Sequence, residues 1–365
     1  MIRTFTTTLI STILVFAFSD AQSTYTYTQP QESNDGWETA SLKEQGVDTA
    51  RVYHLFSQMH QGGNKVHSVL LVKDNKLIIE EYFNGQKANE QHDLRSATKS
   101  IISLLVGIAL DKGYINSLDD PITTYLKTPI PEKNLHPKKD SISLRHLLTM
   151  ATGLDCNDWD PKSAGQEDRV YRKKDWIQYT LDLPLINEPG TVSQYCTMGV
   201  ILMAEIISRA SGMPIDAFAA KYLFEPLSIT NVSWGHTSSK EVIASGKRLY
   251  MTSRDMAKIG QLLLNKGMWE DKQIVSSEWI KESTTTQTSI TGREYGYLWW
   301  NIPLGREGQR VGTKVASGNG GQYIMVVPEL DMVAVFTGGA YNSQEDKLGF
   351  AIMTDIFLPT FNGEK

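Results

Sequence analysis

Ser96 and Lys99 are the two residues whose types and spacing most directly suggest chemistry. They lie three residues apart at the start of an apolar stretch, so on a helix both side chains project from one face. A serine hydroxyl becomes an effective nucleophile when a neighbouring base removes its proton, and a neutral lysine can be that base. Lowering a lysine pKa from about 10.4 to near 7 requires about 4 kcal/mol, from burial or a nearby cation. The pair therefore suggests acyl transfer, although a serine at this position also serves as a plain helix cap.

The segment that carries this pair is predicted to be a core helix that begins at Ser96. Residues 101–110 are apolar on nearly every side, which is typical of a helix with no solvent face. Gly113 suits the left-handed position just after the helix end. We expect the apolar surroundings to lower the pKa of Lys99 by desolvation, and the helix N-terminus to favour negative charge on the serine.

Strand signals lie towards both ends of the chain, and helical signals lie between them. The expected strands span 66–72, 76–83, 295–301, 322–327 and 332–337, with a hairpin turn at 73–75. Helical spacing occurs at 47–61, 144–150, 199–210, 214–223, 253–266 and 344–358. This order predicts an α+β fold, in which one antiparallel sheet built from both termini is flanked by helices. The sheet subdomain would comprise about 41–130 and 285–365, with a mainly helical insertion at about 131–284.

The composition excludes several classes of function. The chain has 365 residues, a net charge of −5 and a pI of about 5.9, so no basic surface for nucleic acid is expected. The sequence contains no CxxC and no HExxH pattern, and its seven histidines are scattered. No GxSxG pattern is present, which argues against a Ser-His-Asp hydrolase. We therefore expect a mechanism with neither a metal nor another cofactor.

Residues 1–21 have the pattern of an export leader. Arg3 precedes an apolar stretch at 9–18, and Ser19 and Ala21 stand at the −3 and −1 positions of a cleavage site before Gln22. The stretch is shorter than the roughly 20 apolar residues that span a bilayer, so no stable membrane anchor is expected after cleavage. Residues 22–40 would form a flexible lead-in to a hydrolase domain at 41–365. The expected location is periplasmic or secreted.

Several ordered motifs resemble the serine β-lactamase-like superfamily, which includes the penicillin-binding proteins. They resemble most the class C branch, and within it the esterases and the 6-aminohexanoate-oligomer (nylon oligomer) hydrolases. The matching segments cover about residues 45 to 360. They are Asp93-Leu94-Arg95-Ser96-Ala97-Thr98-Lys99-Ser100, the run 143–154, Glu188-Pro189-Gly190-Thr191, Tyr195-Cys196-Thr197, the run 295–300 and Ala316-Ser317-Gly318-Asn319-Gly320-Gly321.

The resemblance implies roles for particular residues. Tyr195 would lie beside Lys99 and share proton transfer with it, so the two are best treated as one titrating pair. The backbone N–H groups of Ser96 and Asn319 would form the oxyanion hole. The alternatives are that Tyr195 is a structural tyrosine and that the glycine-rich run is an ordinary turn. Candidates for substrate contact are Thr197, Ser317, Gly318, Tyr171 and Trp299.

Two departures from the family pattern bear on the substrate. Thr197 stands where true β-lactamases carry an asparagine, and Ala316 stands where relatives carry lysine or histidine. Lys314 should share the strand face of Ala316. Both departures favour a small ester or non-peptide amide as the substrate over β-lactams and D-amino-acid peptides. The alternatives are a β-lactamase or D,D-peptidase, and a non-catalytic binding or sensor module on the same scaffold.

Cys156 and Cys196 are the only cysteines. In an oxidising compartment they could form a disulfide, and the resemblance places both near the wall of the site. The alternative is two small buried residues that never meet.

Overall fold

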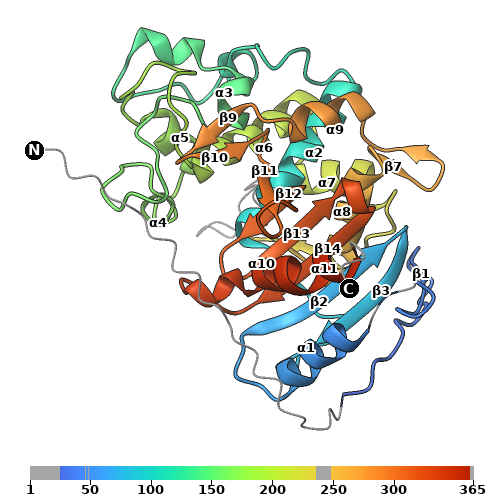
Figure 1. The fold of residues 1–365 in the computed structure, drawn as a ribbon. Helices are drawn as coiled ribbons and strands as arrows, with labels where there is room; N and C mark the ends of the chain where they lie inside the picture. The colour runs from blue at the N-terminus through green and yellow to red at the C-terminus, as the bar shows by residue number, and fades with distance from the viewer. Residues whose placement is uncertain (1–24, 46, 48, 236–247, 362–365) are drawn as a thin grey trace, which may run out of the picture.

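The computed structural model describes residues 25–45, 47, 49–235 and 248–361, and the predicted leader lies outside them. The main sheet contains β1 (Glu38–Thr39), β2 (Val66–Lys73), β3 (Lys76–Tyr82), β9 (Thr288–Ile290), β10 (Arg293–Tyr295), β11 (Trp300–Leu304), β12 (Val311–Gly318), β13 (Gln322–Val327) and β14 (Met332–Gly338). Within the described chain these nine strands lie in the order β1-β3-β2-β14-β13-β12-β11-β10-β9 (Figure 1). Neighbours are antiparallel except for β1 and β3. Strands from both ends of the chain thus form one sheet, which confirms the predicted α+β architecture.

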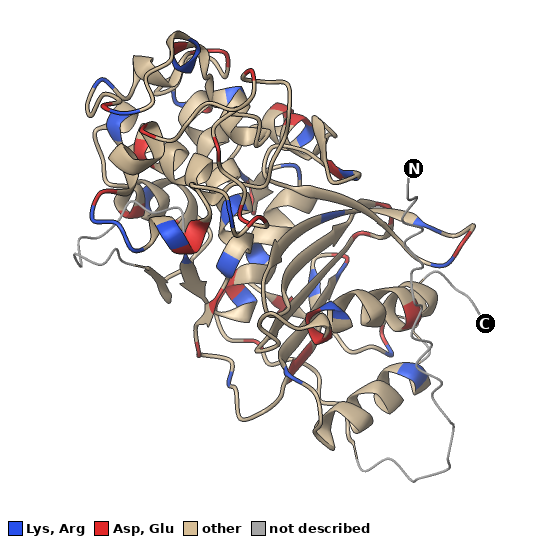
Figure 2. Ribbon diagram, turned by 90° about the vertical axis from the view of Figure 1, so that its left-hand side faces the viewer, with Lys and Arg blue, Asp and Glu red and all other residues tan. Residues whose placement is uncertain are grey.

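Helices cover both faces of this sheet. They are α1 (Ala50–His60), α2 (Thr98–Asp111), α3 (Leu144–Leu148), α4 (Glu167–Val170), α5 (Trp176–Leu181), α6 (Thr197–Ser211), α7 (Ile215–Ala219), α8 (Ser253–Leu264), α9 (Ser277–Thr284), α10 (Leu348–Ile352) and α11 (Leu358–Phe361). Short strands β4 (His92–Asp93), β5 (Val232–Trp234) and β6 (Leu249–Met251) form a second sheet, and β7 (Met268–Trp269) pairs with β8 (Lys272–Gln273). Figure 2 shows charged residues mainly on helices and loops, and few on the central strands.

Close packing fixes the layers. On one face, Gly260 of α8 lies so near the sheet that a Cβ atom there would stand 2.4 Å from Val333. On the other face, the Tyr323 ring packs against Phe350 and the Phe336 ring against Phe357, both from the C-terminal helical segment. The sheet is therefore the middle layer of a sandwich, with its apolar side chains covered on both sides.

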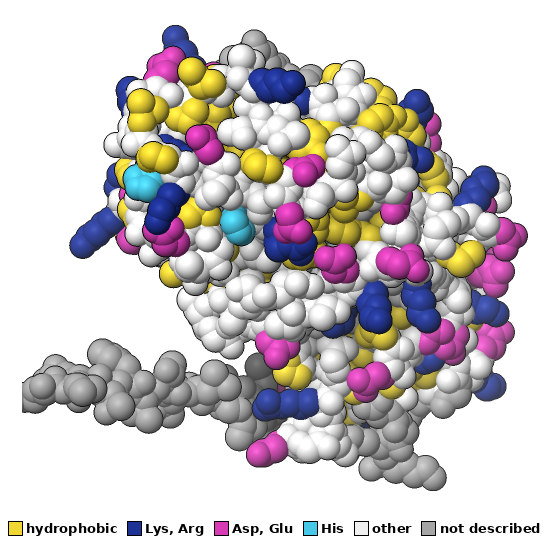
Figure 3. All heavy atoms as spheres, turned by 90° about the horizontal axis from the view of Figure 1, so that it is seen from above, with side chains coloured by type: hydrophobic (Ala, Val, Ile, Leu, Met, Phe, Trp, Pro, Cys, Tyr) yellow, Lys and Arg dark blue, Asp and Glu magenta, His cyan; other side chains and the backbone are white. Residues whose placement is uncertain are grey.

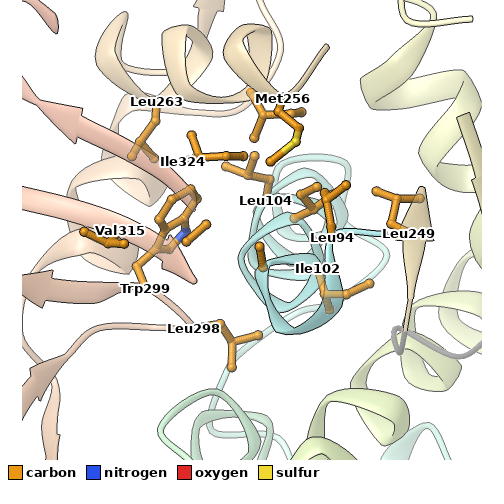
Figure 4. Packing of buried hydrophobic residues seen from close by; sticks show 14 of the residues in the cluster. Leu94, Ile102, Leu104, Leu249, Met256, Leu263, Leu298, Trp299, Val315 and Ile324 are labelled. Carbon is orange, nitrogen blue, oxygen red and sulfur yellow. The ribbon is translucent and has the colours of Figure 1, made fainter. Parts of the chain in front are cut away.

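The helix α2 lies in the core, as its apolar sequence predicts. Its residues from Thr98 to Ala109 are all buried, and Figure 4 shows Leu104 near Ile324 of the sheet and Met256 of α8, with Ile102 on the side of Leu94 and Leu249. Gly113 has a φ of 72° and donates its N–H to Leu110, so it occupies the predicted left-handed position. A polar group on this helix is removed from bulk water, and its charge state depends on the protein groups around it.

Two predicted elements differ from those observed. The strand expected at 295–301 is interrupted, because Leu298 adopts a φ of 65° and β10 and β11 fold back on each other. The helix α8 was assigned to the helical insertion, but it packs on the main sheet instead. Its apolar stripe matches the sheet surface, which the order of elements along the chain does not reveal.

The segment predicted as a flexible lead-in makes specific contacts from Tyr25 onwards. The guanidinium of Arg254 donates to the Gln31 carbonyl at 2.6 Å and pairs with Asp35 at 2.9 Å and with Glu80 at 2.7 Å. Trp37 is buried, and β1 adds to the sheet edge. Buried charges need partners, so this ion-pair cluster attaches residues 31–40 to the domain.

Neither a single membrane-spanning helix nor a cluster of metal ligands is found among the described residues. None of these helices alone has the length and hydropathy of a bilayer span, and α6 passes only together with residues 215–224, across a bend of 77°. Within the described residues, no group of three or more His, Cys, Asp and Glu could hold a metal ion. Figure 3 shows basic, acidic and apolar side chains intermixed over the face seen from above.

Candidate active site

Ser96 lies in a single 3₁₀ turn (Arg95–Ala97) that precedes α2, rather than at the first residue of the α-helix. Arg95 adopts a φ of 50°, an unusual conformation for a residue with a side chain. Asp93 holds this turn, because its carboxylate accepts the Arg95 N–H at 3.0 Å and pairs with the Arg95 guanidinium at 3.0 Å. Strain next to a reactive residue is common in active sites. Asp93 thus positions the turn that presents the Ser96 hydroxyl.

The structure brings the three predicted catalytic side chains together. The Lys99 ammonium donates to Ser96 Oγ at 3.0 Å and lies 4.9 Å from the centre of the Tyr195 ring. Both Lys99 and Tyr195 are buried, whereas Ser96 is partly accessible. A carbonyl carbon that reaches Ser96 would therefore meet both proton-transfer groups at once.

The charge state of Lys99 differs from the prediction. Burial alone lowers the pKa of Lys99, but the fields of Tyr195, Asp158 and Glu167 outweigh burial and raise this pKa above its ordinary value. The expectation that apolar packing would make this lysine neutral is therefore wrong. The two carboxylates come from the loop before α4 and from α4 itself, and together with Tyr195 they favour the ammonium form of Lys99.

Asp158 lies near the Lys99 ammonium and also binds the backbone around Tyr195. Its N–H donates to the Tyr195 carbonyl at 2.8 Å, and its Oδ2 accepts from the Thr197 N–H at 2.8 Å and the Thr197 hydroxyl at 2.7 Å. This carboxylate caps the start of α6, where free N–H groups favour negative charge. Burial raises the pKa of Asp158 to about 6, while Lys99 acts in the opposite direction. The Thr197 hydroxyl, a predicted substrate contact, is occupied by this bond.

This geometry predicts an acid limb in the pH profile. Because the pKa of Asp158 is about 6, its carboxylate is charged above that pH and loses its charge as the pH falls below it. The neutral form no longer balances the Lys99 ammonium, so we expect kcat/KM for an ester to fall as the pH drops from 7 to 5. In Asp158→Asn, kcat/KM should be lower at every pH, and the inflection near pH 6 should be absent.

The matched control is Asp160→Asn, because Asp160 is an exposed carboxylate two residues away. It should keep the wild-type profile. An inflection near pH 6 that persists unchanged in Asp158→Asn would assign the titration to another group.

The two cysteines are joined in the structure. Cys156 and Cys196 form a disulfide with a Cα–Cα distance of 5.4 Å, and both are buried. The bond closes a loop across a separation of 40 residues and connects the Asp158 segment to the residue that follows Tyr195. It therefore lies in the wall of the site, where the resemblance places both cysteines.

Removing this bond should destabilise the protein. A loop of this length predicts a loss of about 3–4 kcal/mol in the free energy of unfolding, because the unfolded chain gains freedom. The measurement is urea unfolding of wild type with and without reductant, beside a Cys156→Ala, Cys196→Ala variant. Intact-mass analysis after alkylation checks the bond in the native protein. Equal midpoints for the reduced and oxidised forms would contradict the prediction.

The end of β12 lies directly against the nucleophile turn. A Cβ atom at Gly318 would stand 2.2 Å from the Leu94 carbonyl oxygen, so only glycine permits this approach. The next residue, Asn319, carries the second predicted oxyanion donor, and its side chain is fixed by two hydrogen bonds to Asn342. The strand therefore reaches the turn of Ser96 at the position where a second backbone donor is needed.

The other residues of this strand are engaged elsewhere. The Ser317 side chain interacts with the Tyr323 hydroxyl, on the sheet face opposite to Ala316. Lys314 shares the face of Ala316, but its ammonium donates to the Thr284 carbonyl at 2.8 Å and to Asn301 at 3.0 Å. Its charge is thus used to join α9 to β11.

The aromatic candidates are placed differently from one another. Trp299 is fully buried in the core, so its prediction as a substrate contact is wrong, and Figure 4 shows it packed beside Val315. Tyr171 donates to Glu167 at 2.7 Å, at the edge of the charged group around Lys99. The aromatic rings next to Tyr195 are instead Trp159 and Trp300, which the sequence did not identify.

The sequence is similar to a known protein family and to a curated hydrolase. The sequence model of the Beta-lactamase family matches residues 54–360. The 6-aminohexanoate-dimer hydrolase of Paenarthrobacter ureafaciens is 24% identical over 287 residues, which cover 73% of this chain and 70% of that protein.

Two solved structures have a similar fold. A candidate 6-aminohexanoate-dimer hydrolase from Bacillus anthracis superposes with a TM-score of 0.71 at 21% identity, covering 91% of this chain and 90% of that one. The simvastatin synthase of Aspergillus terreus superposes with a TM-score of 0.69 at 14% identity, covering 86% and 99%.

Proposed function

This chain belongs to the beta-lactamase family and is a serine hydrolase, and we propose that it cleaves a small ester or amide through an acyl-enzyme on Ser96. The observation that carries the proposal is the hydrogen bond of 3.0 Å from the Lys99 ammonium to Ser96 Oγ, beside a buried Tyr195. Such an arrangement activates a serine without histidine.

The proton path follows from the charge of Lys99. Because the pKa of Lys99 is raised, its ammonium donates hydrogen bonds, and the Lys99/Tyr195 pair accepts the Ser96 proton through the Tyr195 oxygen. Ser96 Oγ then bonds to the carbonyl carbon, and the N–H groups of Ser96 and Asn319 stabilise the oxyanion. Tyr195 returns the proton to the leaving oxygen or nitrogen as the C–O or C–N bond breaks. Water attacks the acyl-enzyme by the same steps and releases the acid.

The surroundings of the site favour substrates without a carboxylate. Ala316 offers no charge, and the Lys314 ammonium on the same face is held by Thr284 and Asn301. Asp158 and Glu167 add negative charge near Lys99. A β-lactam or D,D-peptide carries a carboxylate that needs a cation, so ester or non-peptide amide hydrolysis fits better than either rival activity.

We also propose that the protein is exported to the periplasm or secreted. The leader pattern at 1–21 supports this, and so does the buried disulfide, because such bonds persist in oxidising compartments.

The test is a substrate panel on purified mature protein. We expect p-nitrophenyl esters of short acids to be hydrolysed faster than a chromogenic cephalosporin, and Ser96 to be labelled by a fluorophosphonate. Faster cephalosporin turnover would favour the β-lactamase alternative. Neither turnover nor labelling would favour a non-catalytic module.

A further inference from the structure

Trp159 is a large apolar side chain that remains 50% exposed beside the candidate catalytic tyrosine. Its ring lies parallel to the Tyr195 ring, with a distance of 4.9 Å between centres and an angle of 6° between planes. Trp300 lies 5.8 Å from Tyr195 and 6.3 Å from Trp159, again nearly parallel to both. The rings of Trp159, Trp300 and Tyr195 thus contact one another with nearly parallel planes. Of the three, Trp159 is the one exposed to solvent.

The backbone that carries Trp159 is held without help from its ring. Cys156 is bonded to Cys196, the Asp158 N–H binds the Tyr195 carbonyl, and the Asp158 carboxylate binds Thr197. These three links join the segment 156–158 to Tyr195 and to the two residues that follow it. An exposed indole is therefore not needed to fix this loop, so its half-exposed ring is available to contact a substrate.

The position of the tryptophan rings beside Tyr195 indicates which part of the substrate would contact them. In the proposed reaction Tyr195 gives its proton to the leaving oxygen or nitrogen, so the leaving group lies nearest to Tyr195. Trp159 adds an exposed aromatic face beside that phenol, and the buried Trp300 ring packs against both. Flat aromatic surfaces bind aromatic or extended aliphatic groups, which gain free energy on leaving water.

We propose that Trp159, whose ring stacks on the buried Trp300, forms the binding surface for the leaving group, and that this enzyme selects esters or amides whose alcohol or amine carries an uncharged apolar group. The inference rests on the proposed function, because it assumes that Tyr195 protonates the leaving group. Asp158, one residue before Trp159, and nearby Glu167 disfavour an anionic leaving group at the same surface.

The experiment uses one acyl group and a series of alcohols. Acetate esters of ethanol, butanol, hexanol and phenylethanol share the same acyl-enzyme, so differences in kcat/KM report only on the leaving group. In the wild type we expect kcat/KM to rise with the apolar size of the alcohol. In Trp159→Ala the advantage of the hexyl and phenylethyl esters over ethyl acetate should fall about tenfold, mainly through KM. Trp159→Phe should restore most of it.

Tyr341→Ala is the matched control. Tyr341 is another aromatic side chain that is 40% exposed, and it packs on Arg95 next to Ser96 instead of on Tyr195. It should leave the alcohol preference unchanged. An equal loss for all four esters in Trp159→Ala would show that Trp159 only holds Tyr195, and an unaltered preference would exclude any contact with the alcohol. Either result overturns this inference, whereas ethyl acetate hydrolysis by the wild type preserves the proposed function. The proposed function fails only if neither an ester nor an amide is cleaved.

Discussion

Replacing Ser96 with alanine is expected to lower kcat/KM for ester hydrolysis about 10⁴-fold or more. The Ser96 hydroxyl lies at the end of the Lys99 hydrogen bond and is the only atom in this arrangement that can form the acyl bond. Without it, the remaining donors stabilise an oxyanion only for direct attack by water. The measurement is steady-state hydrolysis of a p-nitrophenyl ester, together with fluorophosphonate labelling of both proteins.

Companion variants test whether the site acts as a unit. Lys99→Ala and Tyr195→Phe should lose nearly as much activity as Ser96→Ala, and the losses should not add in double variants. Ser208→Ala makes the same chemical change on α6, where the hydroxyl bonds to the Ala204 carbonyl, and should leave the rate unchanged. If Ser96→Ala kept a tenth of the wild-type rate, another group would have to be the nucleophile.

Replacing Gly318 with alanine is expected to lower kcat by 10²- to 10³-fold, the effect of losing an oxyanion donor (~3–4 kcal/mol). The added Cβ atom would overlap the Leu94 carbonyl oxygen at 2.2 Å, and both partners belong to backbone that cannot move independently. Relief of this overlap pushes the end of β12 away from the nucleophile turn and takes the Asn319 N–H with it. The measurement is kcat for an ester whose acylation limits the rate, with circular dichroism to show that the fold is retained.

The control for this variant lies on the same strand. At Gly312 an added Cβ atom has one neighbour within 4 Å, a Glu329 carboxylate oxygen at 3.9 Å. Gly312→Ala should therefore retain kcat within about twofold. A Gly318→Ala enzyme that is folded and loses less than fivefold in kcat would argue against Asn319 as the second donor.

The nucleophile and the sheet could be predicted because their signals are local. The spacing of Ser96 and Lys99, the hairpin at β2 and β3 and the apolar body of α2 each depend on neighbours in sequence. The raised pKa of Lys99 could not be predicted, because besides Tyr195 it depends on Asp158 and Glu167, two carboxylates about 60 to 70 residues further along the chain. A sequence pattern indicates that Lys99 is buried, but it does not indicate which charged side chains are buried beside it.

The aromatic surface was missed for a related reason. A single backbone conformation at Leu298 breaks the expected strand, so Trp299 turns into the core and Trp300 reaches Tyr195. Trp159 lies in a loop without periodicity, where no pattern indicates what its ring contacts. The only available signal was a tryptophan near Cys156, one partner of the expected disulfide.

The three links between residues 156–158 and 195–197 also have an evolutionary consequence. They close the base of the segment from 159 to 194, so its two ends keep their places whatever lies between them. Lengthening a loop whose ends are already joined costs little free energy. Insertions and deletions in this segment could therefore accumulate in descendants without displacing Tyr195. The enzyme has a region in which new substrate preferences can arise by changes of length, while the catalytic residues stay under separate selection.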